Sequence, residues 1–106
     1  MTLSPDTRQR IDQLLSENRI VLFMKGTRNA PRCGFSARVL KVLGETGIPF
    51  KTADMDSDQT LWQTLSEMNN WPTSPQIYVN GEFIGGCDIL MEMNRNGELK
   101  QMLEAP

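Results

Sequence analysis

Five consecutive apolar residues, Ile20–Met24, constrain the fold more than any other stretch of this sequence. They are rich in strand-forming types and show no polar alternation, which is the pattern of a strand buried on both faces of a sheet. A polar loop over residues 25–33 follows, and the patterns after it predict an amphipathic helix over Gly34–Glu45 and a short strand over residues 50–54. A strand–helix–strand unit of this length requires a right-handed crossover. The sequence therefore predicts an α/β fold built around two parallel strands.

Shorter patterns on either side of this unit predict the remaining elements. In chain order they are a helix that begins at Ser4-Pro5-Asp6 and ends at Glu17-Asn18, a helix capped by Asp56-Ser57-Asp58, strands at residues 76–79 and 82–85 joined by an Asn80-Gly81 turn, a helix capped by Asp88, and a short helix after Asn96-Gly97. Ser and Asp accept hydrogen bonds at helix starts, and Asn-Gly is a strong hairpin signal. The order predicts a single domain, residues 1–106, with a thioredoxin-like mixed sheet of four strands flanked by about five helices.

The composition argues against several classes of protein. The 106 residues suffice for one core, and a net charge of −2 with a pI of about 5.0 gives no footprint of nucleic-acid binding. No apolar run reaches the ~18 residues of a membrane-spanning helix, and the first residues lack the pattern of a secretory signal. Two cysteines are too few for a disulfide-rich secreted fold. We therefore expect a cytoplasmic protein that binds neither nucleic acid nor membranes.

The sequence contains two cysteines, Cys33 and Cys87, and no histidine. Cys–His nucleophilic pairs and imidazole metal ligands are therefore excluded. Two thiolates cannot complete a four-thiolate metal site within one chain. A metal centre on this chain would need a second subunit, an external thiol, or both.

Cys33 stands where the polar loop meets the first turn of the predicted helix. Unpaired backbone N–H groups and the positive end of the helix dipole favour a thiolate there. Lys25, Arg28 and Arg32 add positive charge to the same loop. A buried structural cysteine would be expected inside a strand or on an apolar helix face. A reactive or metal-ligating thiol is therefore the favoured interpretation, and an inert core cysteine is the alternative.

Two features elsewhere could contribute to a site around Cys33. A cis peptide bond before Pro75 would turn the backbone of Ser74 toward an extended ligand, whereas a trans bond would make an ordinary turn. Lys25 follows the first strand, where a lysine is usually solvated but could instead bind a ligand anion. The sequence leaves these alternatives open.

The segment Gly85-Gly86-Cys87-Asp88 is a second junction between a loop and a helix. Gly85 and Gly86 permit close backbone approach, and the helix N-terminus that follows can bind an anion. Asp88 could cap its own helix, accept hydrogen bonds from a ligand ammonium group, or do both. Cys87 is either a small buried residue or a second thiol within reach of Cys33.

The motifs around Cys33 resemble those of a known family. Cys33-Gly34-Phe35-Ser36 resembles the signature of the single-domain monothiol glutaredoxins, which have Cys-Gly-Phe-Ser at the active site. Other family motifs occur in the same order and at the same spacings, namely Met24-Lys25-Gly26-Thr27, Trp71-Pro72-Thr73, Pro75-Gln76 and Gly85-Gly86-Cys87-Asp88. The resemblance covers nearly the whole chain.

The resemblance implies a glutathione site and a shared iron–sulfur cluster. In this family two subunits hold a [2Fe–2S] cluster through one active-site cysteine from each chain and two glutathione thiols, so Cys33 would be the iron ligand. The residues implied at the glutathione site are Lys25 for a carboxylate, the backbone of Ser74 beside cis-Pro75, the backbone of Cys87 with Asp88 for the γ-glutamyl end, and Phe35, Trp62, Thr73 and Gly86 around them.

The resemblance also implies partners. Such proteins are expected to be monomers without a cluster and homodimers with one. They typically carry clusters to apo iron–sulfur proteins, often together with BolA-like partners. Each of these statements follows from the resemblance and not from the residue pattern.

Two positions depart from the family pattern. The family usually has an arginine nine residues before the tryptophan of the Trp-Pro-Thr motif, where it binds a glutathione carboxylate. This chain has Trp62 there, and tryptophan cannot form a bidentate salt bridge. Arg28 and Arg32 are the candidates to compensate. Ser74 replaces a larger apolar residue, and this change leaves its backbone role intact.

Three functions follow from these observations. A cluster-binding and transfer protein is favoured because Ser36 replaces the second cysteine of a dithiol motif, so that Cys33 has no local resolving thiol. In a redox enzyme, Cys33 would attack a disulfide or a glutathionylated protein, and glutathione or Cys87 would resolve the intermediate. Resolution by Cys87 would require a disulfide, for which the Cα atoms of Cys33 and Cys87 must lie within ~7 Å of each other, and we expect them to lie farther apart. An interaction module without a cofactor is the third function, and it predicts that Cys33→Ala has no phenotype.

Overall fold

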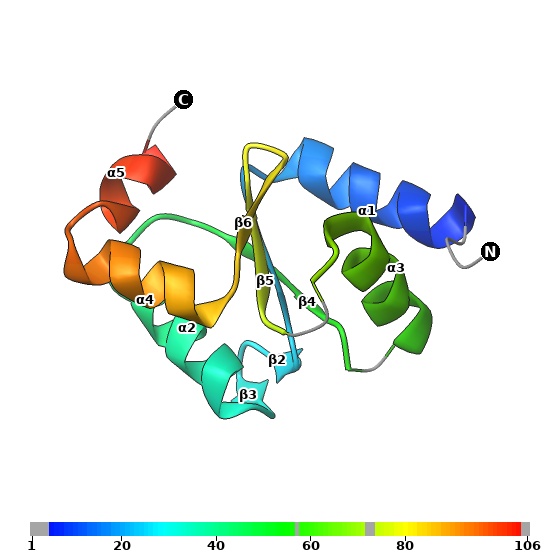
Figure 1. Ribbon diagram of the computed structural model, residues 1–106, viewed down its shortest axis with the longest axis horizontal. Helices are drawn as coiled ribbons and strands as arrows, with labels where there is room; N and C mark the ends of the chain where they lie inside the picture. Colours follow the sequence, from blue (N-terminus) through cyan, green and yellow to red (C-terminus); the bar gives the residue numbers. More distant parts are fainter. Residues whose placement is uncertain (1–4, 57, 72–73, 105–106) are drawn as a thin grey trace.

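The computed structural model describes residues 5–56, 58–71 and 74–104, which fold into five helices around a sheet (Figure 1). The elements in chain order are α1 (Pro5–Glu17), β1 (Ile20–Met24), β2 (Gly26–Thr27), β3 (Ala30–Pro31), α2 (Gly34–Glu45), β4 (Lys51–Asp54), α3 (Gln59–Asn69), β5 (Gln76–Val79), β6 (Glu82–Gly85), α4 (Cys87–Arg95) and α5 (Leu99–Glu104).

The main sheet has four strands in the order β4-β1-β5-β6. β1 pairs in parallel with β4 and antiparallel with β5, and β6 forms an antiparallel hairpin with β5. Two residues with positive φ, Asn80 (53°) and Gly81 (79°), make the turn of this hairpin, as the Asn-Gly signal predicts. The mixed four-stranded sheet is therefore the predicted one.

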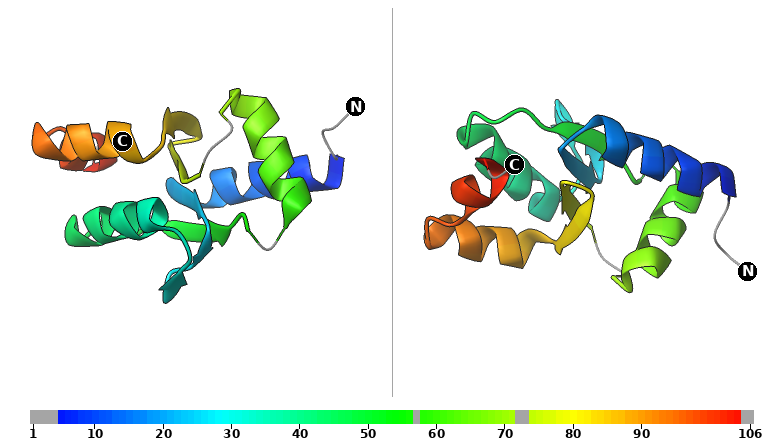
Figure 2. Two further views of the ribbon diagram at one scale, coloured as in Figure 1. Left: turned by 60° about the horizontal axis from the view of Figure 1, so that its bottom comes forward. Right: turned by 90° about the horizontal axis from the view of Figure 1, so that it is seen from above.

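The core consists of two clusters, one on each face of the sheet. Alternate residues of β1 supply both clusters, because successive side chains of a strand point to opposite faces. Ile20, Leu22 and Met24 pack with residues of α2, α4 and α5, and Val21 and Phe23 pack with residues of α1 and α3. The two groups of helices lie on opposite sides of the sheet in Figures 1 and 2. Every residue of β1 is buried, which explains its continuous apolar sequence.

The segment expected as an irregular loop contains a small hairpin of β2 and β3. Gly26 permits it, because its φ is +91° and a Cβ atom there would lie 2.5 Å from the carbonyl oxygen of Ala30. The N–H of Gly26 also donates to Asp54 Oδ1 at 2.9 Å. The hairpin was not predicted because two-residue strands carry no alternation pattern. It fixes the chain between β1 and Cys33.

Two helix starts differ from their predictions. Asp58 alone caps α3 within the described residues, with its side chain accepting from the N–H of Leu61, and Ser57 lies outside those residues. At α4 the N-cap is Gly86, and Asp88 is the second residue of the helix. The prediction that Asp88 caps this helix is therefore wrong. Its carboxylate instead lies in the first turn, where the helix dipole favours negative charge.

No helix in the described part of the chain combines the length and the apolar character needed to cross a membrane.

Candidate functional site

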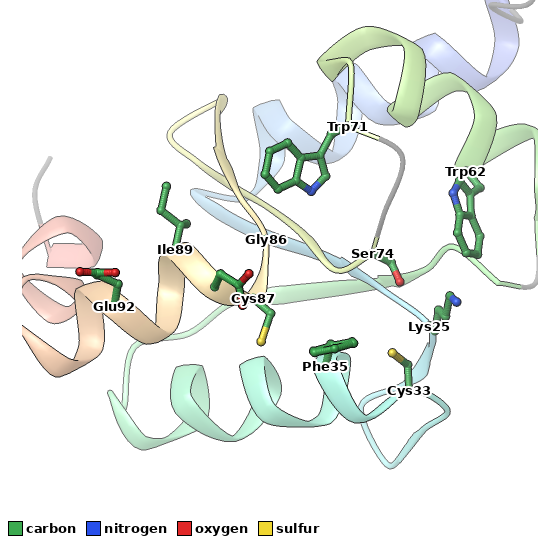
Figure 3. Close-up of a pocket in the computed structure, with 11 residues that line it drawn as sticks. Lys25, Cys33, Phe35, Trp62, Trp71, Ser74, Gly86, Cys87, Ile89 and Glu92 are labelled. Carbon is green, nitrogen blue, oxygen red and sulfur yellow. The ribbon is translucent and has the colours of Figure 1, made fainter.

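A pocket of about 690 Å³ opens beyond the carboxyl end of β1 (Figure 3). Segments far apart in the sequence form its wall, as expected where an α/β sheet ends. The lining residues are Lys25 after β1, Cys33 and Phe35 at the start of α2, Trp62 on α3, Trp71 and Ser74 before β5, and Gly86, Cys87, Asp88, Ile89 and Glu92 at and along α4.

Cys33 is the N-cap residue of α2, as the sequence predicts. Its side chain is partly exposed, and no disulfide involves it. The backbone N–H of Ser36 lowers the pKa of the Cys33 thiol most, and the N–H of Phe35, the Lys25 ammonium and the Ser36 hydroxyl lower it further. Partial burial opposes these effects without reversing them. Cys33 is therefore an accessible thiol with increased thiolate character at neutral pH.

Lys25 lies between Cys33 and Trp62 on one side of the pocket (Figure 3). Its N–H donates to the hydroxyl of the buried Ser36 at 3.1 Å, and its carbonyl accepts from the N–H of Arg32 at 2.9 Å. Its Nζ atom lies 4.7 Å from the centroid of the Trp62 ring, which is a cation–π distance. Lys25 is thus held both at its backbone and at its tip.

Phe35 is apolar but does not join the buried side of α2. Its side chain is 54% exposed at the pocket, and Val39, Val42 and Leu43 form the buried face of the helix instead. Phe35 occupies the first turn, which extends past the end of the sheet. The prediction that Phe35 belongs to the binding site agrees with its place in the wall.

The peptide bond between Ser74 and Pro75 is cis. Ser74 lines the pocket, whereas Pro75, which was also predicted at the site, is not among the described residues that line it. A Cβ atom at Gly86 would lie 3.0 Å from the carbonyl oxygen of Pro75 and 3.3 Å from Trp71 Nε1, so a side chain there would require one of these neighbours to shift. Thr73 lies outside the described residues. The loop before β5 and the start of α4 therefore approach each other closely at the pocket.

Cys87 differs from Cys33 in burial and charge. It is 8% exposed, belongs to the core cluster beside α2, and is also a free thiol. Burial raises the pKa of the Cys87 thiol. Cys87 is thus a small buried residue, the first of the two interpretations, and it also lines the pocket that Cys33 lines. That its thiol comes within reach of Cys33 stays a prediction.

Comparison with known proteins places this architecture in a family. Residues 20–84 match the family model described as glutaredoxin. A Synechocystis protein described as an uncharacterized monothiol glutaredoxin ycf64-like is 52% identical over 102 residues, which cover 96% of this chain and 95% of that protein. The chain belongs to the monothiol glutaredoxins.

Other glutaredoxins support the assignment. Monothiol glutaredoxin-S7, chloroplastic, from Oryza sativa is 44% identical over 96% of this chain, which spans 61% of its length. The solution structure of reduced poplar apo GrxS14 matches with a TM-score of 0.86 at 41% identity, covering 98% of this chain and 95% of that one. A buckwheat glutaredoxin–glutathione complex matches with a TM-score of 0.82 at 31% identity, covering 92% and 87%. The predicted thioredoxin-like glutaredoxin fold is confirmed.

The two arginines of the loop before Cys33 do not line the pocket of this glutaredoxin. The Arg28 guanidinium lies 4.2 Å from the centroid of the Phe50 ring and donates to the Phe50 carbonyl. Arg32 forms ion pairs with Asp54 at 3.0 Å and Asp56 at 3.5 Å. Neither therefore takes the place of an arginine at position 62. Lys25 is the cation that lines the described part of the pocket.

Three lining residues of the glutaredoxin pocket were absent from the predicted site, namely Trp71, Ile89 and Glu92. Trp71 belongs to the Trp-Pro-Thr motif, which could have indicated it. Ile89 is a large apolar residue of the kind usually buried, yet it is 45% exposed. Glu92 follows Asp88 by four residues on α4, a spacing that places both on one helix face. This spacing was the available signal.

Proposed function

We propose that this protein binds glutathione in the Cys33 pocket and, as a dimer, carries a [2Fe–2S] cluster to apo iron–sulfur proteins. The observation that carries the proposal is the Cys33 thiol, which opens on a pocket large enough for a tripeptide and has a lowered pKa. Thiolate is the form that ligates iron.

The charges of the pocket suit a glutathione molecule. Lys25 offers a cation for a carboxylate, and Asp88 and Glu92 offer carboxylates for the ammonium of the γ-glutamyl end. Glu92 lies on the side of the pocket away from Lys25 (Figure 3). The backbones of Ser74 and Cys87 are the proposed peptide-binding groups between these ends. The structural similarity to the buckwheat glutaredoxin–glutathione complex supports the same proposal.

The donor set of one chain suits a cluster that two chains share. Among the described residues, no three Cys, His, Asp or Glu side chains lie close enough together to hold a metal ion. Cys33 would supply one thiolate, and a second subunit and two glutathione molecules would supply three more. The proposal therefore includes a monomer without cluster and a homodimer with it. A BolA-like partner and apo-protein recipients belong to it as well.

The compartment is also a proposal. The two cysteines favour a reducing compartment, and we propose the cytoplasm. The rice relative is described as chloroplastic, so a plastid is the alternative. Imaging of the full-length protein with a fluorescent tag would distinguish them.

Anaerobic reconstitution with iron, sulfide and glutathione tests the cluster proposal. We expect a coloured dimer, detected by its ultraviolet–visible spectrum and its mass in solution, and no colour when glutathione is omitted. Cys33→Ser should remove the cluster, whereas Cys87→Ala should retain it because only the Cys87 backbone is proposed to bind glutathione. A cluster that forms equally well on Cys33→Ser would refute the proposal.

A glutathione-dependent thiol–disulfide oxidoreductase is the second candidate, and the partly exposed Cys33 thiol with its lowered pKa favours it. The Cys33 thiolate would attack the glutathione sulfur of a glutathionylated protein, which forms a mixed disulfide and releases the protein thiolate. A second glutathione thiolate would then attack that disulfide, releasing oxidised glutathione and restoring Cys33. Two free thiols and no mixed disulfide after treatment with oxidised glutathione would contradict this candidate.

A further inference from the structure

Lys25 is the cationic side chain of the described pocket wall, and its backbone has little freedom. Hydrogen bonds to Ser36 and from Arg32 hold its N–H and its carbonyl. The four-carbon side chain is flexible by chemistry, so without a contact at its tip the ammonium group would be mobile. A mobile ammonium group loses side-chain entropy when it orders around a ligand carboxylate, and this loss weakens binding.

Trp62 supplies a fixed surface for that ammonium group. It is partly buried against the core cluster on the α1 and α3 side of the sheet. Its backbone N–H donates to the carbonyl of Asp58 at 3.1 Å, in the capped first turn of α3. Its ring centroid lies 4.7 Å from Lys25 Nζ, and both residues line the pocket beside Cys33 (Figure 3). The ring is thus anchored by packing while it contacts the lysine.

We propose that Trp62 is a positioning residue whose ring holds the Lys25 ammonium at the pocket wall, ordered for the terminal carboxylate of a peptide ligand. This inference rests on the proposed function, because the peptide in question is of the glutathione type. In a cation–π contact the ammonium group faces an aromatic ring and does not donate to a hydrogen-bond acceptor. Its N–H donors therefore stay available for a carboxylate. Trp62 therefore improves carboxylate binding without contributing a charge of its own.

The placement of charge in the pocket gives the ligand one orientation. Lys25 and Trp62 lie on one side, and Glu92 lies on the other (Figure 3). A peptide with a free carboxylate at one end and an ammonium group at the other would direct its carboxylate to Lys25. The contribution of Trp62 should consequently depend on that carboxylate.

Nuclear magnetic resonance titrations of the full chain with S-methylglutathione and with its C-terminal amide test this inference. Neither peptide can form a mixed disulfide, so the titrations report binding alone. Wild type should bind the acid more tightly than the amide. Trp62→Leu should reduce this preference by about threefold, the effect of losing a partly exposed cation–π contact. Trp62→Phe should retain most of the preference, because it keeps an aromatic face.

Two further variants separate positioning from a structural effect. In a Lys25→Met background, Trp62→Leu should no longer change the preference, because the ammonium group is gone. Phe50→Leu is the matched control, since it removes the aromatic ring that lies 4.2 Å from the Arg28 guanidinium outside the pocket. It should leave the preference for the acid unchanged.

The outcomes distinguish this inference from the proposed function. If wild type binds neither peptide, both are overturned. If wild type binds and Trp62→Leu keeps the full preference, or weakens acid and amide equally, the positioning role alone is overturned. If Trp62→Leu does not fold, Trp62→Phe is compared in the wild-type and Lys25→Met backgrounds. A small loss of the preference for the acid that occurs only when Lys25 is present supports the inference. An equal loss of binding in both backgrounds overturns it.

Discussion

Cys33 and Cys87 lie on the wall of one pocket, at the N-termini of α2 and α4, and the pKa values of their thiols shift in opposite directions. The N–H of Ser36 is the main cause that lowers the first, and burial raises the second. A helix N-terminus alone therefore does not decide thiol chemistry. The direction of each pKa shift depends on the solvent exposure of the sulfur and on the N–H groups directed at it.

This difference predicts that Cys33 reacts with iodoacetamide faster than Cys87 at pH 7. Its pKa lies below the usual thiol range, so thiolate forms at lower pH and the rate should reach its plateau earlier as pH rises. Site-resolved mass spectrometry measures both rates across about pH 5–10, because this range spans the titration of ordinary thiols. Lys25→Met should move the Cys33 profile to higher pH. Equal rates at the two cysteines would contradict the assignment.

The Asp58 cap predicts an acid-sensitive contribution to stability. The Arg10 side chain, which donates to Asp58 Oδ2 at 2.9 Å, is the main cause that lowers the pKa of this carboxyl, and the Leu61 N–H lowers it further. A carboxyl with a lowered folded-state pKa stabilises the fold above its unfolded pKa of about 3.9 and loses that contribution as pH falls through the folded value. Asp58→Ala should cost about 1 kcal/mol at pH 7 and less in acid.

Urea unfolding at pH 7 and at about pH 3 measures this difference, since pH 3 lies below the unfolded carboxyl pKa of about 3.9, where the contribution has begun to fall. Asp12→Ala is the control, because it removes an exposed i,i+4 pair with Arg8 at 3.3 Å and should cost less than about 0.5 kcal/mol. A penalty for Asp58→Ala that is the same at both pH values would contradict the expected ionic contribution.

Gly86→Ala should damage the pocket. The new methyl group would lie 3.0 Å from the Pro75 carbonyl, a backbone atom that cannot rotate away, so we expect a loss of about 1–3 kcal/mol and weaker peptide binding. Gly44→Ala makes the same change inside α2, where nothing lies within 4 Å, and should stabilise the protein by about 0.5–1 kcal/mol. Thermal unfolding and peptide titration measure the effects. Equal melting temperatures for the two variants would be the contrary result.

The fully buried Gln76 holds the Trp71 segment of the pocket wall through hydrogen bonds. Its Nε2 donates to the Trp71 carbonyl at 3.0 Å, and its Oε1 accepts from Asn69 at 3.0 Å. Gln76→Met keeps the volume but leaves both partners without these bonds, so we expect a loss of about 1–3 kcal/mol. Tyr78→Phe should cost less, because it removes only the hydroxyl bonds to Asn69 and leaves both Gln76 bonds, including the one to the Trp71 carbonyl, in place. Denaturant unfolding compares them, and a neutral Gln76→Met would refute the argument.

Much of the fold could be predicted because local signals specify local structure. The apolar run of β1, the Asn80-Gly81 turn and the Pro5 helix start all specify structure within a few residues of themselves. The prediction of a helix start was wrong where the signal was compatible with two neighbouring positions. Asp88 is a good cap by type, yet Gly86 ends the extended backbone and takes that place. The β2–β3 hairpin was too short to leave a pattern.

The sequence by itself determined the chemistry available to this protein: a thiol at the start of a helix, a lysine after the first strand, no histidine, and the motifs of a glutaredoxin. Only the tertiary structure decided which of these groups meet. It brings Lys25 to the Trp62 ring and directs Arg28 to Phe50 and Arg32 to Asp54. The physical reason is that such contacts depend on how α3 and β4 pack around β1. That packing is set by burial in the two core clusters, whose residues come from all along the chain, so the pattern around Lys25 alone does not specify it.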